Sequence, residues 1–197
     1  MSEVLPAPPS RAPRADAARN RDRLLASAKA VFSAGGAEAS LEAVSRHAGL
    51  GIGTLYRHFP TREALFEAVY RREVEELAAL AERLSGEASP VEALRRWVKA
   101  NVEFVATKKG MAAALALAAH NKALSAYSFV RLSTAAALLL DRARGAGVLR
   151  VEISPEDLFL AMIGMCFAHN QPGWQASALR LMDVFLDGLL APAAKSG

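Results

Sequence analysis

A run of hydrogen-bonding side chains near residue 55 is the part of this sequence best suited to chemistry. Thr54, Tyr56, Arg57 and His58 lie close together, and Arg62 follows shortly after them. Their hydroxyl, guanidinium and imidazole groups are of moderate length and match the phosphates and base edges that a major groove exposes. The pattern therefore favours contact with a nucleic acid.

No pattern in the sequence is typical of an enzyme. We find no nucleophile elbow, phosphate-binding loop or HExxH pair. His58 has no His or Cys at helical ligand spacing, and a single cysteine, Cys166, excludes an intrachain disulfide and a cysteine-based zinc site. We therefore expect no catalytic residue, no metal and no cofactor.

Two short helices are predicted around this run. Ser40 is a suitable N-cap for a helix over 41–48, Gly49 ends that helix, and a second helix covers 52–58 before Pro60. Two short helices joined by a tight turn with glycine form a helix-turn-helix. In such a motif the second helix is the one that reaches DNA.

The rest of the chain is predicted to be helical as well. Long stretches rich in Ala, Leu, Glu and Arg contain no Gly or Pro, which favours helix. The predicted helices cover about residues 16–34, 41–48, 52–58, 61–84, 90–107, 109–119, 122–145, 155–170 and 174–190. We predict an all-α fold of about nine helices, in which a three-helix helix-turn-helix domain precedes a larger helical domain.

Charge divides the chain unevenly. Residues 1–62 contain nine Lys or Arg and five Asp or Glu, whereas residues 63–197 contain fifteen of each. The whole net charge of +4 therefore lies in the first third, as expected of a part that meets a polyanion. We place a disordered basic arm at 1–15, the helix-turn-helix domain at 16–72 and the larger domain at 73–197.

Neither a membrane span nor an export signal is apparent. No segment approaches the roughly 18 uncharged apolar residues of a membrane helix, and the richest run, from Met111 to Ala119, is far too short. The N-terminus lacks the apolar region of a signal peptide. We therefore expect a cytoplasmic protein with no membrane contact.

The segment GIGTLYRHFPTREALFEAV resembles the recognition-helix signature of the TetR family of bacterial transcriptional regulators. The family's core, its aromatic helix end and the start of its next helix are matched by Gly53-Thr54-Leu55-Tyr56, His58-Phe59 and Thr61-Arg62-Glu63. Further matches upstream are Ala28, Phe32, Gly36, Val44 and Ala48-Gly49. The resemblance covers roughly residues 19–72, and beyond it only the helical architecture agrees.

The resemblance implies a homodimeric repressor that binds double-stranded operator DNA and is released by a small-molecule effector. The implied phosphate contacts are Thr54, Tyr56, His58 and Arg62. The residues implied to read or approach bases are Gly51, Ile52, Gly53 and Arg57. Because glycine offers no side chain for readout, specificity would depend on Ile52, Tyr56, Arg57 and DNA shape. A basic arm that follows the phosphates could include Arg11, Arg14, Arg19 and Arg21.

By the same resemblance, the larger domain would bind the effector between its helices and pair its last two helices with a second subunit. The apolar residues expected at that pairing, with an ordinary core as the alternative, are Leu158, Met162, Met165, Leu179, Met182, Phe185, Leu186 and Leu189. The candidates for lining the effector site are Trp97, Asn101, Phe104, Met111, His120, Phe129, Met165, Cys166 and His169. Asn101 follows Trp97 by one turn on a largely apolar face, so a ligand could satisfy an inward-pointing amide.

Three other functions stay open at this point. An enzyme is one, although no catalytic pattern favours it. A DNA-binding protein without an effector is another, and a fully packed interior would favour it, whereas a cavity with a few polar groups would favour a sensor. An activator is the third, because the direction of regulation depends on the promoter and not on the fold.

Overall fold

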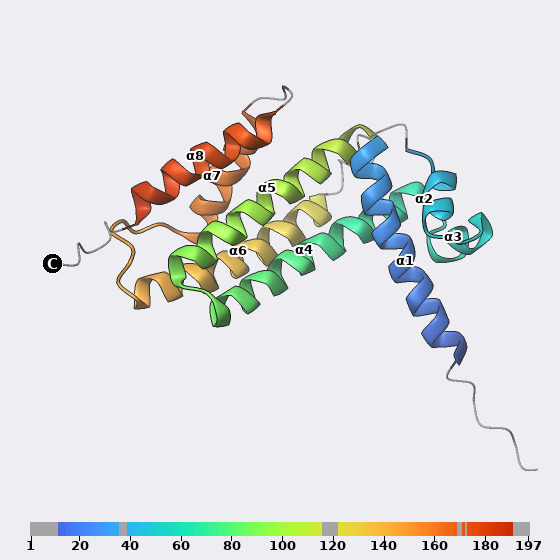
Figure 1. Cartoon of the computed structure of the whole chain (residues 1–197), viewed down its shortest axis with the longest axis horizontal. Coiled ribbons are helices and arrows are strands. Elements are labelled where there is room, and N and C mark those ends of the chain that lie inside the picture. The colour runs from blue at the N-terminus through green and yellow to red at the C-terminus, as the bar shows by residue number, and fades with distance from the viewer. Residues whose placement is uncertain (1–11, 36–38, 116–121, 169–170, 172, 191–197) are drawn as a thin grey trace, which may run out of the picture.

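The computed structural model describes residues 12–35, 39–115, 122–168, 171 and 173–190 (Figure 1). These residues contain no β-strand, and the all-α prediction is confirmed. The eight helices are α1 (Ala12–Gly35), α2 (Leu41–His47), α3 (Ile52–His58), α4 (Arg62–Glu87), α5 (Pro90–Leu115), α6 (Lys122–Gly145), α7 (Pro155–Phe167) and α8 (Trp174–Leu189).

The main differences from the sequence-based expectation of nine helices concern α5 and α1. The helices expected at 90–107 and 109–119 form one helix as far as Leu115, because a glycine such as Gly110 weakens a helix without ending it. Helix α1 begins at Ala12 with Pro13 in its first turn, where the missing N–H breaks no helical hydrogen bond. Residues 12–15 of the expected disordered arm are therefore helical, and residues 1–11 lie outside the described part.

Local capping explains where the short helices of the motif begin and end. The Ser40 hydroxyl accepts a hydrogen bond from Ala43 N at 3.0 Å, and the Thr61 hydroxyl accepts one from Ala64 N at 3.1 Å. Helix α2 ends at His47, and the turn after it contains Gly49, where φ is +63°. There Gly49 N donates to Arg46 O and Leu50 N to Ser45 O, which is the Schellman pattern. The caps predicted at Ser40, Gly49 and Thr61 are thus confirmed.

Two hydrophobic cores follow one another along the chain. The smaller core is shared by α1, α2, α3 and the first two turns of α4, and it ends at Val69. The larger core begins at the next residue, Tyr70, and joins the rest of α4 to α5, α6, α7 and α8. The two cores therefore meet inside α4, which runs from the helix-turn-helix end of the molecule toward the far end (Figure 1).

Helix α6 lies at the centre of the larger unit. Its segment Ala123–Gly145 is long and apolar enough to cross a membrane by length and composition, contrary to our expectation that no segment comes close. It packs against α4, α5 and α7, its Leu132, Leu139 and Leu140 are buried, and its Arg131 binds Glu75 of α4. These contacts identify α6 as a core helix of this domain.

Replacing Gly49 with alanine is expected to lower the free energy of unfolding by about 1–2 kcal/mol, since a side chain disfavours a positive φ. The new Cβ would also lie 3.0 Å from Arg23 Nη2, which donates to Ala48 O. Urea unfolding followed by circular dichroism measures the change.

Gly86→Ala is the matched control, because a Cβ at Gly86 meets no atom within 4 Å and its φ is not positive. Equal stability of the Gly49→Ala variant and the wild type would contradict the role given to this turn.

Candidate nucleic-acid interface and interior cavity

Helix α3 presents one face to its domain and the other to solvent. Leu55 is fully buried, and Phe59, which follows the helix, is nearly so. The solvent-exposed residues of the helix include Ile52, Tyr56 and Arg57. Because α3 stands at one end of the molecule, this face is accessible to a large partner (Figure 1).

The polar groups of α3 are partly engaged with their own helix. Arg57 Nη2 donates to Thr54 Oγ1 at 3.0 Å, and Arg57 Nε donates to Gly53 O at 3.3 Å. Thr54 and His58 are half-buried. The Arg57 guanidinium is on the exposed face. It could therefore donate to acceptor oxygens of a partner in place of these hydrogen bonds within the helix.

The glycines at 51 and 53 are not required by the fold. Both are exposed, neither has a positive φ, and a Cβ built at either position meets no atom within 4 Å. They leave the start of α3 without side chains, so a partner can approach its backbone closely.

Arg62 lies differently from the other predicted contacts. Its guanidinium stands over the rings of Phe32 and Phe66, at 5.6 and 5.2 Å from their centroids, and those rings stack on each other at 4.2 Å. The side chain is half-buried and contributes to the packing of its own domain. A phosphate contact by Arg62 stays a prediction.

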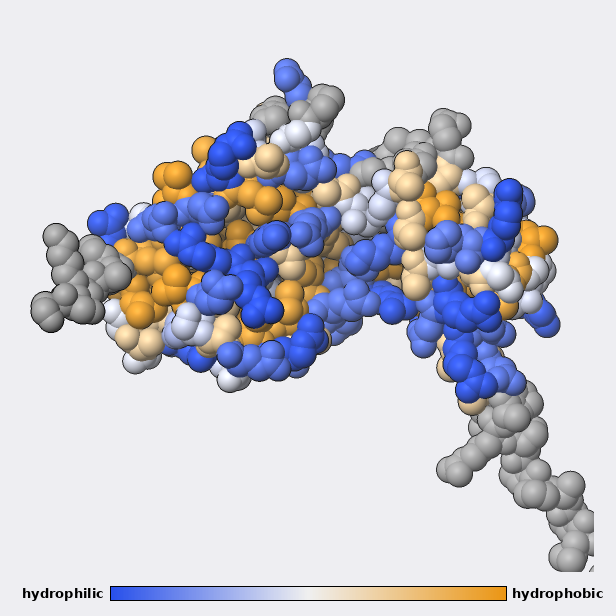
Figure 2. Space-filling view, viewed as in Figure 1, coloured by the Kyte–Doolittle hydropathy of each residue, from blue (hydrophilic) through white to orange (hydrophobic). Residues whose placement is uncertain are grey.

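Part of the predicted basic arm belongs to helix α1. Arg21 stands over the Phe59 ring at 5.5 Å, and Arg19 forms an ion pair with Asp16. The side chains of Arg11 and Arg14 lie outside the described residues. Hydrophilic side chains gather over the lower half of α1, beside the helix-turn-helix (Figure 2).

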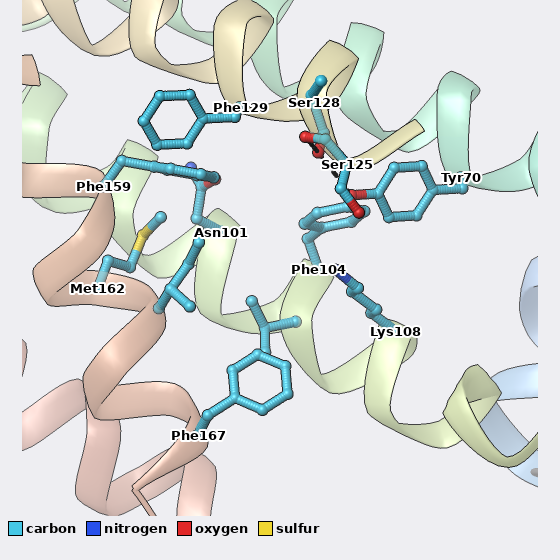
Figure 3. A pocket seen from close by; sticks show the side chains of 13 residues that line it. Tyr70, Asn101, Phe104, Lys108, Ser125, Ser128, Phe129, Phe159, Met162 and Phe167 are labelled. Carbon is cyan, nitrogen blue, oxygen red and sulfur yellow. Dashed lines mark hydrogen bonds between the residues drawn. The ribbon is translucent and has the colours of Figure 1, made fainter. Parts of the chain in front are cut away.

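A cavity of about 380 Å³ lies among α4, α5, α6 and α7 (Figure 3). Most of its wall is apolar or aromatic. The lining residues are Tyr70, Asn101, Phe104, Val105, Lys108, Ser125, Ala126, Ser128, Phe129, Phe159, Met162, Ile163 and Phe167. Ser125, Ala126 and Phe167 are exposed, so the cavity reaches the surface beside them.

The polar groups of the cavity are few and sit at its two ends. Asn101 is fully buried, and its Nδ2 donates to Trp97 O at 2.9 Å. Its Oδ1 has no hydrogen-bond partner among the residues that the structure describes. At the other end the Tyr70 hydroxyl donates to Ser128 Oγ at 2.8 Å, and Lys108 Nζ lies 5.3 Å from the centroid of the Tyr70 ring.

Comparison with known proteins identifies both units. Residues 24–69 match the model of bacterial regulatory proteins of the tetR family, and residues 89–191 match the C-terminal domain described as transcriptional regulator SbtR-like. The chain belongs to the TetR family. It is therefore a DNA-binding transcriptional regulator, as its sequence predicted.

Solved structures of TetR-family proteins agree with this assignment. SCO0520 from Streptomyces coelicolor is 43% identical, with 88% of this chain and 99% of that chain covered and a TM-score of 0.78. A TetR transcription regulatory protein from Mycobacterium vanbaalenii is 30% identical over 90% and 99% of the two chains, with a TM-score of 0.73. SmeT, a repressor from Stenotrophomonas maltophilia, is 20% identical over 88% and 91%, with a TM-score of 0.61, and supports the fold alone. No match is found among curated protein sequences.

The cavity of this TetR-family regulator includes three of the nine side chains that we predicted for an effector site, namely Asn101, Phe104 and Phe129. Trp97 is buried beside it and donates its Nε1–H to Leu77 O, so it packs the core. Met165 and Cys166 also lie outside the lining, and burial raises the pKa of the Cys166 thiol to about 11. The side chains of Met111, His120 and His169 are outside the described residues.

Several lining residues were missed by the sequence analysis. Tyr70, Lys108, Ser125 and Ser128 look like ordinary helical residues in the sequence, and only the meeting of three helices brings them together. The spacing of Asn101 and Lys108 by two helical turns was the one available signal. In the described ranges no group of three or more His, Cys, Asp or Glu side chains could hold a metal ion.

Most apolar residues predicted at a subunit interface pack inside this chain instead. Leu158, Met162, Met182, Leu186 and Leu189 are buried in the larger core, and Met165, Leu179 and Phe185 are partly buried against it. Helical periodicity shows that a helix has an apolar face, but it does not show which face meets the chain's own core. The exposed apolar residues of α7 and α8 are Leu160, Phe167, Leu181 and Val184.

An ion pair joins the helix-turn-helix to the larger domain. Lys29 Nζ of α1 lies 2.6 Å from Glu73 Oε2 of α4, and the Glu73 carboxylate is almost completely buried. Burial raises the pKa of the Glu73 carboxyl, and the hydrogen bond and charge of Lys29 offset part of that rise. The ionised form of Glu73 therefore lowers the stability of the folded state, even though the carboxylate is paired with Lys29.

The stability of the regulator should depend on pH through this group. In the unfolded chain Glu73 loses its proton at a lower pH than in the folded chain, so rising pH through that interval removes stability. Glu73→Gln abolishes the effect, so the stability of this variant relative to wild type should improve from pH 4.5 to pH 7.5. Urea unfolding at the two pH values measures it.

Glu76→Gln is the matched control, since Glu76 is an exposed neighbour 4.0 Å from the same lysine. A Glu73→Gln variant that loses stability relative to wild type as the pH rises would contradict the assignment.

Proposed function

We propose that this regulator is a cytoplasmic, homodimeric repressor that leaves its operator when a small molecule fills the cavity. The observation that carries the proposal is the position of Tyr70. It lines the cavity, yet it is the direct neighbour of Val69, the last residue of the helix-turn-helix core. A ligand that displaces Tyr70 must therefore act on the helix that supports the DNA-binding unit.

Helix α4 is suited to carry that displacement. Tyr70 lies eight residues after Arg62, about 12 Å along the helix. Arg62 in turn covers the stacked Phe32 and Phe66 rings, which connect α4 to α1. A tilt of α4 at Tyr70 would therefore move the packed residues of α1 and α4 that support α3.

We assign DNA contact to the exposed face of α3 and the residues beside it. Ile52, Tyr56 and Arg57 would face the major groove, and the glycines at 51 and 53 would let the helix approach closely. In a dimer two such helices would meet successive major grooves, roughly 34–36 Å or a multiple apart.

The exposed apolar residues of α7 and α8 are proposed to form the dimer interface. Leu160 and Phe167 lie seven residues apart on α7, and Leu181 and Val184 lie one turn apart on α8, so each helix presents an apolar stripe. Arg95 of α5 binds Asp183 and Asp187, which fastens the acidic side of α8 to its own subunit. These helices stand at the end of the molecule opposite α2 and α3 (Figure 1).

A regulator without an effector is the competing proposal for the larger domain. It would need a packed interior, because its helices would serve dimerisation alone. The interior instead contains about 380 Å³ of space beside a buried amide oxygen without a partner in the described residues. Such an arrangement favours a ligand-binding role.

Arg57→Ala is expected to weaken binding to a duplex from the protein's own promoter region by about 1–3 kcal/mol while leaving the fold intact, because the side chain is exposed. Tyr56→Ala should weaken binding too. Fluorescence anisotropy over a series of salt concentrations, with excess random DNA, measures the affinities.

Arg96→Ala is the matched control, because Arg96 is an exposed arginine of α5 and its loss changes the net charge equally. Equal affinities of the Arg57→Ala and Arg96→Ala variants would rule out the proposed role of α3.

Val184→Asp is expected to convert the dimer to a monomer, because Val184 is 71% exposed in one chain and an aspartate at an apolar interface would be buried without a partner. Size-exclusion chromatography with light scattering measures the mass.

Val130→Asp is the matched control, since Val130 is 64% exposed and belongs to α6 instead of the proposed interface helices. A Val184→Asp variant that remains dimeric would place the interface elsewhere.

A further inference from the structure

We infer that the cavity takes an elongated, largely aromatic molecule that carries a hydrogen-bond donor at one end and an anionic group at the other. This inference rests on the proposed function, because it treats the cavity as the effector site. It adds the chemical class of the effector, which we derive from the residues at the two ends and along the wall.

The donor end is set by Asn101. Its Nδ2 donates to Trp97 O at 2.9 Å, and turning the amide over would place two acceptor oxygens against each other. The orientation is therefore fixed, and Oδ1 is the atom left without a partner among the described residues. A buried acceptor without a partner is unfavourable, and an O–H or N–H of a ligand would satisfy it. A hydrogen-bond acceptor of a ligand at this position would leave Oδ1 without a partner.

The wall between the two ends favours flat rings. Phe104, Phe129 and Phe159 line it together with Met162, and the Phe129 and Phe159 rings meet edge to face at 5.6 Å. Figure 3 shows Asn101 pointing toward Phe129 and Phe159, so the donor would enter among aromatic rings. Aromatic ligands gain contact area and ring interactions in such a site.

The anionic end is set by Lys108. It follows Asn101 by seven residues on α5, so the two lie on one face of the helix about 10.5 Å apart. Its ammonium stands beside Tyr70, and no carboxylate pairs with it in the described ranges. The Ser125 hydroxyl lies at the same end (Figure 3). A carboxylate placed there would find a positive charge and a hydroxyl donor near the mouth of the cavity.

Three related compounds test this inference on the full-length protein. The probe 4′-hydroxybiphenyl-4-carboxylate carries both end groups, biphenyl-4-carboxylate lacks the donor, and 4-hydroxybiphenyl lacks the anion. Isothermal titration calorimetry should show that the first probe binds the wild type roughly tenfold more tightly than either of the others. Asn101→Leu should remove the preference for the hydroxyl group, and Lys108→Gln should remove the preference for the carboxylate.

Lys99→Gln is the matched control, since Lys99 is exposed on the same helix and outside the cavity, and both preferences should persist in it. Equal binding of the three probes to the wild type would overturn the inferred chemistry and leave the cavity as a ligand site. No binding of any probe would overturn it as well. The comparison of the Arg57→Ala and Arg96→Ala variants on promoter DNA needs no ligand. Its result therefore distinguishes a failure of the proposed DNA-binding role from a failure of this inference. The comparison of probes on the wild type alone stays decisive if the Asn101→Leu variant does not fold.

Discussion

Helix α4 holds the last residues of one hydrophobic core and the first residues of the other, with no glycine or proline between Arg62 and Ser85. A helix without such residues bends little, and densely packed interiors transmit small displacements. The position of α3 is therefore tied to whatever fixes α4 inside the larger domain. A cavity away from α4 would lack this connection, whereas this one has Tyr70 of α4 in its wall.

The ion pairs that join α4 to its two neighbouring helices differ in their burial. Toward α1 the buried Glu73 carboxylate meets Lys29, and its raised pKa shows that the pairing does not fully offset burial. Toward α6 the exposed Glu75 accepts hydrogen bonds from Arg131 and Tyr127, which lowers its pKa. Exposed ion pairs contribute little to stability, and a poorly compensated buried pair contributes little as well. Neither ion pair fastens α4 strongly, so a small tilt of α4 need not break a strong ionic interaction.

What the sequence could predict was mostly local. The caps at Ser40 and Thr61 and the turn at Gly49 depend on a few neighbouring residues, and all three are present as predicted. The buried amide of Asn101 was predictable too, because a polar residue stood out on an apolar face. Tyr70 and Lys108 were missed because a cavity wall depends on where separate helices meet. Most of the apolar residues predicted at the subunit interface pack in the chain's own core, because periodicity does not tell an inward apolar face from an outward one.

The proposed release by a ligand requires that the cavity differ between the DNA-bound and DNA-free states of the regulator. A ligand that filled the same cavity equally well on and off DNA would shift nothing, however tightly it bound. Reversing a 99:1 preference takes about 5.5 kcal/mol of difference in binding free energy between those states. Asn101 and Phe104 lie on α5 and would interact with ligand in either state. Tyr70 lies on the helix that supports α3, and its hydroxyl donates to Ser128 at the opposite end of the cavity from Asn101. The difference in affinity must therefore arise chiefly at the Tyr70 end, where ligand and DNA-binding unit compete for the position of one helix.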